Sequence, residues 1–110
     1  MEFETKKHGT TTVISLKERK LDATVSSELK GEFLLLCVPG VKSLVIDLSE
    51  VEFCDSSGLS ALLIAERKMR EAGGDVRLAG LNKKVLTLIK ISHLDRAFQI
   101  YDTVAKAIKA

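Results

Sequence analysis

The sequence predicts a single α/β domain over residues 1–110, with a mixed, mostly parallel sheet of four to five strands and about four helices in the order ββαβαβαβα. Three observations favour this fold class. The length of 110 residues suits one domain. Hydrophobic residues make up 45% of the chain, enough to bury a core. Segments with strand character alternate with segments of helical period, which is typical of parallel sheets crossed by helices.

The chain opens with two short alternating segments, Phe3 to Lys7 and Thr11 to Leu16, separated by His8-Gly9. Two such segments around a turn predict a β-hairpin. Its first strand should form an antiparallel edge of the sheet. The charged stretch from Lys17 to Lys20 then leads to the first helix.

Helical spacing predicts that this helix begins near Thr24 and ends before Pro39. Its apolar positions are Val25, Leu29, Phe33 and Leu36. The run from Ser43 to Leu48 is almost continuously apolar, as expected for a central strand covered on both faces. We interpret residues 49–54 as a short linker.

A second amphipathic helix follows Asp55 and ends at Gly73-Gly74. Its apolar positions are Leu59, Leu62, Leu63, Ala65 and Met69. The segment from Val76 to Ala79 predicts another short strand, which ends at Gly80.

The last third of the chain predicts a helix, a strand and a helix. Asn82 is expected to cap a third helix with apolar positions Val85, Leu88 and Ile89. The segment from Phe98 to Tyr101 predicts the last strand. Asp102 is expected to cap a terminal helix that contains Val104, Ala105 and Ile108.

The composition does not favour a metal or cofactor site. Cys37 and Cys54 form no CxxC pair, and they are interpreted as reduced, small hydrophobic residues. His8 and His93 lack the spacing of metal ligands. No phosphate-binding GxxxxGK[ST] motif occurs. We therefore expect no metal and no cofactor.

Membrane insertion and nucleic-acid binding are not expected either. The longest apolar run has six residues, Phe33 to Val38, whereas a membrane-spanning helix needs about 20. The N-terminal residues do not resemble a secretory signal, so we expect a cytoplasmic location. The net charge is only +2, and the basic residues have few aromatic neighbours that could stack on bases.

The most informative segment is Asp55-Ser56-Ser57-Gly58, directly ahead of an apolar helix. An Asp-Ser-Ser tract is a common helix N-cap, and capping by itself is one interpretation. One capping oxygen is enough, however, and here three consecutive residues offer one. The glycine costs up to about 1 kcal/mol of helix propensity unless something approaches the backbone closely. These features make the segment a candidate functional loop.

In its context this segment resembles the STAS domain, in particular the stand-alone bacterial anti-sigma factor antagonist. The resemblance rests on the run from Phe53 to Leu59, on Val45 to Ser49 before it, and on the Leu21-Asp22-Ala23 turn. It covers essentially the whole chain and implies a single STAS-like domain. One departure is Arg19-Lys20, which stands where many relatives have glycine and an acid, and it bears on the choice of partner.

The resemblance also implies a function. The unphosphorylated protein would bind an anti-sigma factor and so release a sigma factor, which regulates transcription indirectly and requires no enzymatic activity. The anti-sigma factor, itself a serine kinase, would phosphorylate Ser56 and end the interaction, and a serine phosphatase would reverse the modification. The residues implied in partner binding are Leu21, Asp22, Thr24, Asp55, Ser57 and Gly58.

Other interpretations fit less well. An aspartyl-phosphate receiver would use Asp47 at the end of the central strand, but it also needs an acidic pair after the first parallel strand, where Leu16-Lys17 stands instead. A serine hydrolase needs a base near the nucleophile, and neither histidine lies in a recognisable motif. Within the same fold, the alternative is a STAS scaffold or accessory subunit of a stress-signalling or transport complex.

Overall fold

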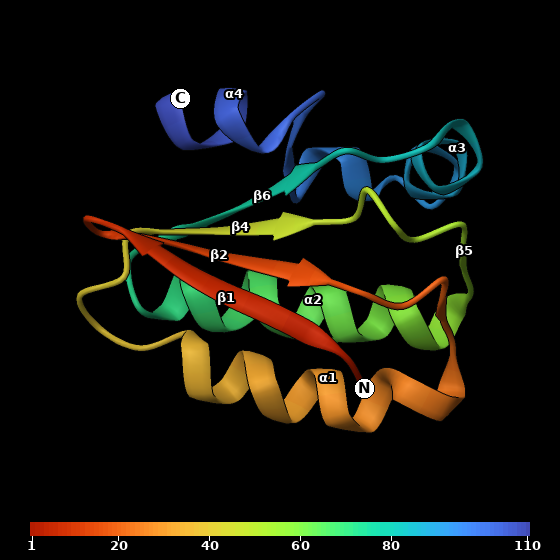
Figure 1. Cartoon of the computed structure of the whole chain (residues 1–110), viewed down its shortest axis with the longest axis horizontal. Helices are drawn as coiled ribbons and strands as arrows, with labels where there is room; N and C mark the ends of the chain where they lie inside the picture. The colour runs from red at the N-terminus through yellow and green to blue at the C-terminus, as the bar shows by residue number, and fades with distance from the viewer.

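A five-stranded sheet with the order β1-β2-β4-β6-β7 forms the centre of the structure, a computed structural model that describes residues 1–110 (Figure 1). Its strands are β1 (Phe3–His8), β2 (Thr11–Leu16), β4 (Ser43–Asp47), β6 (Asp75–Ala79) and β7 (Gln99–Tyr101). β1 pairs with β2 in the antiparallel sense at one edge, and the other neighbours are parallel. The expected mixed, mostly parallel sheet is confirmed.

Two helices cover one face of this sheet, and a third, shorter one covers the other (Figure 1). The helices are α1 (Ala23–Leu36), α2 (Ser56–Glu71), α3 (Lys83–Ile91) and α4 (Val104–Lys109), with a 3-10 turn at Leu94–Arg96. α1 and α2 lie together on one face, whereas α4 lies on the opposite face. None of the helices combines the length and the apolar content that crossing a bilayer requires.

The side-chain alternation of β4 explains this layering. Leu44 and Ile46 belong to the main core of 21 buried residues, which also includes side chains of α1, α2 and α3. Val45 points the other way, into a small cluster with Ala107 of α4. Because successive side chains of a strand face opposite sides, a strand that is buried on both faces needs an unbroken apolar run. The run from Leu44 to Ile46, which is fully buried, meets that requirement.

Two further strands lie outside the main sheet, where the sequence pattern predicted only a charged stretch and a linker. β3 (Lys20–Leu21) and β5 (Phe53–Cys54) pair in parallel. The expected order ββαβαβαβα holds for the main sheet and its helices but lacks these two strands. A two-residue strand carries no detectable period, and its backbone pairing depends on how the two loops are placed.

Two helix boundaries also differ from the expected ones. α1 begins at Ala23 because Asp22 is its N-cap and accepts a hydrogen bond from the Thr24 backbone N–H at 3.0 Å. The N-cap of α4 is Thr103, not Asp102: its hydroxyl accepts from the Lys106 N–H at 3.2 Å. Asp102 instead pairs with the Lys106 ammonium at 3.5 Å. Both residues cap helices well, so the backbone conformation decides between them.

The carboxyl ends of β2, β4 and β6 lie at the same end of the sheet (Figure 1). The segments that follow them, residues 17–22, 48–55 and 80–82, therefore meet there. The starts of α1, α2 and α3 lie at this end as well. The carboxyl end of a parallel sheet is the usual binding end of α/β folds, and it holds the candidate loop of this chain.

Candidate functional site

Asp55 caps α2 and uses one carboxylate oxygen for two backbone groups. Its Oδ1 accepts from the N–H of Ser57 at 2.9 Å and from that of Gly58 at 3.1 Å. The Asp55 carbonyl accepts from the N–H of Leu59 at 3.0 Å. The cap is thus complete without either serine hydroxyl. The capping interpretation accounts for Asp55 but not for the serines.

Ser56 is the exposed residue of this loop, and Ser57 is half-buried. Neither serine hydroxyl makes a hydrogen bond within the structure, and Asp55 satisfies the N–H groups of Ser57 and Gly58. A hydroxyl in this position is open to a modifying enzyme or to a partner. The structure therefore distinguishes two adjacent serines that the sequence presents as equivalent caps.

Gly58 is buried where the first turn of α2 touches β3. A Cβ atom at this position would overlap the carbonyl oxygen of Leu21 and would lie 2.7 Å from the Cys54 Sγ and 2.8 Å from the Leu21 Cβ. Such distances are too short for non-bonded atoms. The sequence suggested that some group approaches the backbone of this glycine closely. That group is the protein's own β3 backbone. Leu21 and Gly58 are both buried, and their contact determines the shape of the loop above them.

Asp22 and Thr24 are joined by hydrogen bonds at the start of α1. The Asp22 Oδ1 accepts from both the hydroxyl and the backbone N–H of Thr24, and these bonds hold the pKa of the Asp22 carboxyl below its usual value. Asp22 is half-buried, and the Thr24 side chain is exposed. The parallel neighbours β2 and β4 place this turn at the same end of the sheet as Ser56.

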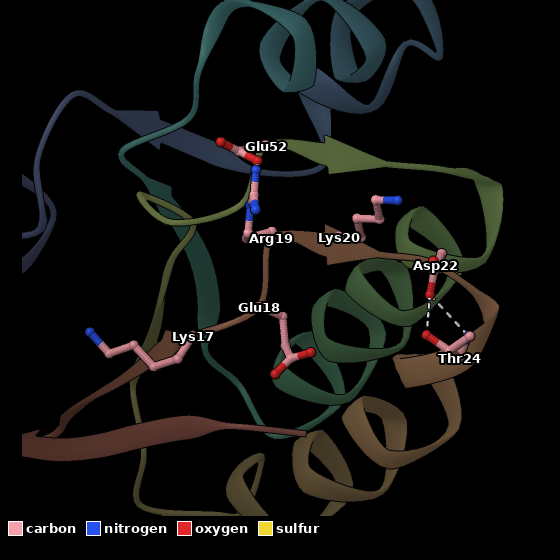
Figure 2. Close-up of a pocket in the computed structure, with 7 residues that line it drawn as sticks. All are labelled: Lys17, Glu18, Arg19, Lys20, Asp22, Thr24 and Glu52. Atoms are coloured by element: carbon pink, nitrogen blue, oxygen red, sulfur yellow. Dashed lines mark hydrogen bonds and ion pairs between the residues drawn. The ribbon is translucent and has the colours of Figure 1, made fainter.

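An open hollow of about 590 Å³ lies beside this turn (Figure 2). Its lining residues are Lys17, Glu18, Arg19, Lys20, Asp22, Thr24 and Glu52. All of them are polar, and both signs of charge are present. Small-molecule sites are mostly apolar, so this hollow does not have the lining that is typical of one.

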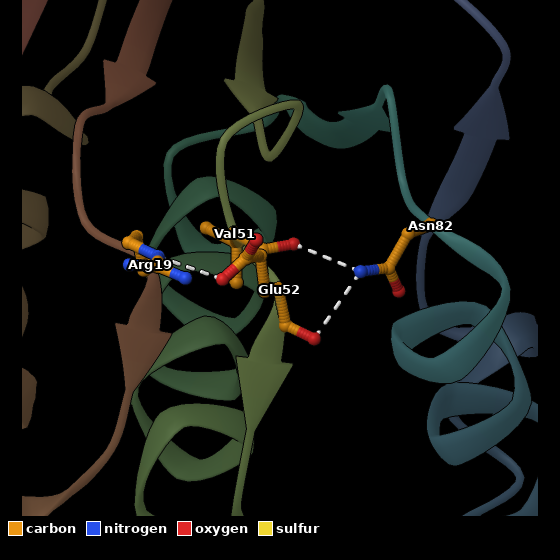
Figure 3. Close-up of polar contacts among 4 residues, drawn as sticks. All are labelled: Arg19, Val51, Glu52 and Asn82. Atoms are coloured by element: carbon orange, nitrogen blue, oxygen red, sulfur yellow. Dashed lines mark hydrogen bonds and ion pairs between the residues drawn. The ribbon is translucent and has the colours of Figure 1, made fainter.

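Arg19, Glu52 and Asn82 connect three segments of the chain across this end of the sheet (Figure 3). The Arg19 guanidinium pairs with the Glu52 carboxylate at 2.7 Å, and the Arg19 carbonyl accepts from the Glu52 N–H at 2.8 Å. The Asn82 amide donates to the carbonyls of Val51 and Glu52, both at 3.2 Å. Its Oδ1 accepts from the Val85 N–H at 2.8 Å and so caps α3, as expected from the sequence.

Sequence reasoning identified Asn82 only as a cap and missed its amide bridge. The sequence showed Arg19 as a departure from the family pattern, but it did not indicate that Glu52 is the ion-pair partner of Arg19. No sequence signal links these positions, because the contacts depend on how the loops fold over the sheet. Asp47, at the end of β4, bonds the loop that follows it: its Oδ1 accepts from the Ser49 N–H at 3.0 Å.

The Cys54 thiol, which lies next to Gly58, is not an activated nucleophile. Burial raises the pKa of the Cys54 thiol to about 11, so this thiol stays protonated and poorly nucleophilic at neutral pH. Both cysteines are free. No cluster of three or more His, Cys, Asp and Glu side chains has the arrangement of a metal site.

The fold and the loop define a small α/β module that presents a serine, free of capping bonds, at the carboxyl end of its sheet. Residues 2–107 match the model of the STAS domain, and the chain belongs to that family. The resemblance seen in the sequence is thereby confirmed.

Known relatives share the fold. A structure of an anti-sigma factor antagonist (STAS) domain protein from Planctomyces limnophilus is 23% identical, covers 96% of this chain and 92% of that one, and has a TM-score of 0.87. The phosphorylated form of SpoIIAA, a Bacillus cell fate determinant, is 20% identical, covers 98% of this chain and 97% of that one, and has a TM-score of 0.74.

A curated relative from Thermotoga maritima carries the provisional name anti-sigma factor antagonist. It is 31% identical over 70 residues, which are 64% of this chain and 62% of that protein. The aligned stretch thus spans less than two thirds of the relative's length.

The Gly58 contact predicts that Gly58→Ala destabilises the domain by about 1 to 3 kcal/mol, because the added methyl group has no space against β3. Gly31→Ala is the matched control: Gly31 lies in α1 with nothing within 4 Å of the added atom. That change should stabilise the protein by about 0.5 to 1 kcal/mol through helix propensity. Urea unfolding of both variants measures the difference. Equal stability of the two variants would contradict the contact.

The two roles of Asn82 can be separated by substitution. Asn82→Ser keeps a capping oxygen but is too short to reach the carbonyls of Val51 and Glu52, so it should cost about 1 to 2 kcal/mol. Asn82→Ala removes the cap as well and should cost about 1 kcal/mol more. Thermal and urea unfolding give both values. If Asn82→Ser unfolds like the unchanged protein, the amide bridge does not contribute to stability.

Proposed function

We propose that this protein is an anti-sigma factor antagonist controlled by phosphorylation of Ser56. In its unphosphorylated form it binds an anti-sigma factor and thereby frees a sigma factor. It acts in the cytoplasm through protein contacts alone, without catalytic turnover, cofactor, membrane or direct nucleic-acid binding. The observation that carries the proposal is the exposed Ser56 hydroxyl, which no group of the protein uses, on the loop that is most characteristic of the family.

The partner surface is proposed to surround Ser56. Asp22 and Thr24 at the start of α1 would join Asp55 and Ser57 in contacting the anti-sigma factor, since all four are at least partly exposed at the same end of the sheet. Leu21 and Gly58 would contribute through the loop shape that they maintain, because both are buried.

The local electrostatics explain how phosphorylation would end binding. A phosphate adds a charge of about −1.5 to −2 at pH 7, directly beside the Asp55 carboxylate. A helix N-terminus can offset such a charge through its free N–H groups. Here Asp55 already occupies the N–H groups of Ser57 and Gly58. Most of the new charge would therefore face the partner, where an unpaired buried charge costs several kcal/mol.

The fold should survive the modification. Ser56 is exposed, and the cap of α2 does not involve its hydroxyl. The main core lies between the sheet and the helices and does not include Ser56. A switch of this kind changes the binding surface and leaves the stability of the domain nearly constant. The partner proposed to add the phosphate is the anti-sigma factor acting as a serine kinase, and a serine phosphatase would remove it.

The phosphate should map to Ser56. Incubation with the cognate anti-sigma factor and ATP, followed by digestion and mass spectrometry, is expected to show one labelled serine. Ser56→Ala should abolish the label, and Ser57→Ala, the matched control, should retain it. Kinase-free protein should neither label itself nor hydrolyse ATP. Predominant label on Ser57, or self-labelling, would refute this assignment.

Charge at position 56 should weaken partner binding. Ser56→Asp is expected to lose tenfold or more in affinity for the anti-sigma factor, which corresponds to about 1.4 kcal/mol. Ser56→Ala should bind like the unmodified protein. Ser92→Asp, a change at an exposed serine just after α3, controls for the added charge. Titration calorimetry measures the affinities, and circular dichroism checks the fold. Equal affinities for all variants would exclude this loop from the contact surface.

A further inference from the structure

A small apolar cleft lies between β5 and α3, next to the Ser56 loop. Its volume is about 220 Å³, and it is lined by Phe53, Cys54, Lys84, Val85 and Leu88. Sites for drug-sized molecules usually measure about 300 to 1,000 Å³. This cleft is smaller and suits a single side chain of another protein. Its floor is well packed, since Cys54 and Val85 are buried at 5% and 1% exposure.

Phe53 is unusual among the aromatic residues of this chain. Phe33 and Phe98 are buried, and Phe3 packs against the core. Phe53, by contrast, is 49% exposed. Strand alternation explains the direction of its side chain: Cys54 turns inward towards Gly58, so Phe53 turns outward. Apolar aromatic surface left in water beside a cleft is typical of the core of a protein interface.

Positive charge lies at the cleft and beside it: Lys84 lines the cleft, and Lys83 lines the neighbouring hollow. Helix stability does not explain these charges. Lys83 and Lys84 form the first turn of α3, which contains no acid. Cations are unfavourable at a helix N-terminus. Neither lysine pairs with a carboxylate within 4.0 Å. Glu52, which lines a neighbouring hollow together with both lysines, is engaged by Arg19 at 2.7 Å. This region therefore offers unpaired positive charge around an apolar centre.

We propose that this cleft is a second docking point for the anti-sigma factor and that it takes an apolar side chain from an acidic segment of that partner. Lys83 and Lys84 would pair with the flanking carboxylates, and Phe53 would cover the inserted side chain. The proposal rests on the proposed function. It also rests on continuity: β5, which lines the cleft, leads directly through Asp55 to Ser56, so one partner can contact the loop and the cleft together.

Titration calorimetry with the purified anti-sigma factor tests the cleft by substitution. Phe53→Ser and Lys84→Glu are each expected to weaken binding tenfold or more. The matched controls lie at the other end of α3: Ile91→Ser, at a side chain that is 69% exposed, and Lys90→Glu. Both controls should bind like the unchanged protein, and circular dichroism should show every variant folded.

The outcomes separate this inference from the proposed function. If Phe53→Ser and Lys84→Glu bind normally while Ser56→Asp still loses affinity, the proposed function stands and the cleft is not a docking point. If Ser56→Asp also binds normally, the proposed function fails too. Loss of affinity in the control variants as large as in the cleft variants would also overturn the cleft, because the effect would not be specific to it.

A second experiment needs no anti-sigma factor. A random peptide library is selected on the unchanged protein and counter-selected on the Phe53→Ser variant. Enriched peptides should carry an apolar residue flanked by Asp or Glu, and they should lose binding to Lys84→Glu. Enriched peptides without acids, or no enrichment, would overturn the proposed chemistry. Binding of a single-stranded oligonucleotide that depends on Lys84 but not on Phe53 would assign the lysines to nucleic acid instead.

Discussion

The contact between β3 and the first turn of α2 is the constraint on which the rest of the site depends. The Leu21 carbonyl accepts a hydrogen bond from the Asp55 N–H at 3.1 Å, and Gly58 lets the helix backbone lie directly against Leu21. This contact joins a loop from the first third of the chain to a loop from its middle. The contact fixes the residue at which α2 begins. As a result, Asp55 forms the N-cap of α2, and the Ser56 side chain takes no part in the cap.

Polar bridges then connect this contact to the neighbouring segments. Arg19 and Glu52 tie the two loops together on one side, and Asn82 ties the second loop to the start of α3 on the other. Exposed ion pairs contribute little stability singly, typically about 0 to 1 kcal/mol. Their main effect here is to hold the loops in place. Each bond limits the freedom of a loop that contributes only a few apolar side chains to the core. The proposed partner would therefore meet a surface that is largely formed before binding.

The residues that stabilise the fold are different from the exposed serine that is proposed to be modified. The main core of 21 residues depends on apolar side chains of the sheet and of α1, α2 and α3, and the serine hydroxyl contributes nothing to it. If Ser56 is phosphorylated as proposed, the added charge would change the exposed surface of this loop strongly, and the fold beneath it would change little.

Sequence patterns were enough to predict the main sheet, its four helices and the family to which the chain belongs. Apolar periodicity was sufficient for α1, α2 and β4, because burial of one helix face or of both strand faces leaves a regular pattern. Capping chemistry was sufficient for Asn82, and it predicted a cap within the Asp55-Ser56-Ser57 tract without deciding which of the three residues forms it. Four features could be seen only in the folded chain: the β3–β5 pairing, the amide bridge of Asn82, the choice of Thr103 over Asp102, and the atoms that approach Gly58. These features depend on contacts between loops or on local backbone conformation, and neither leaves a periodic trace in the sequence.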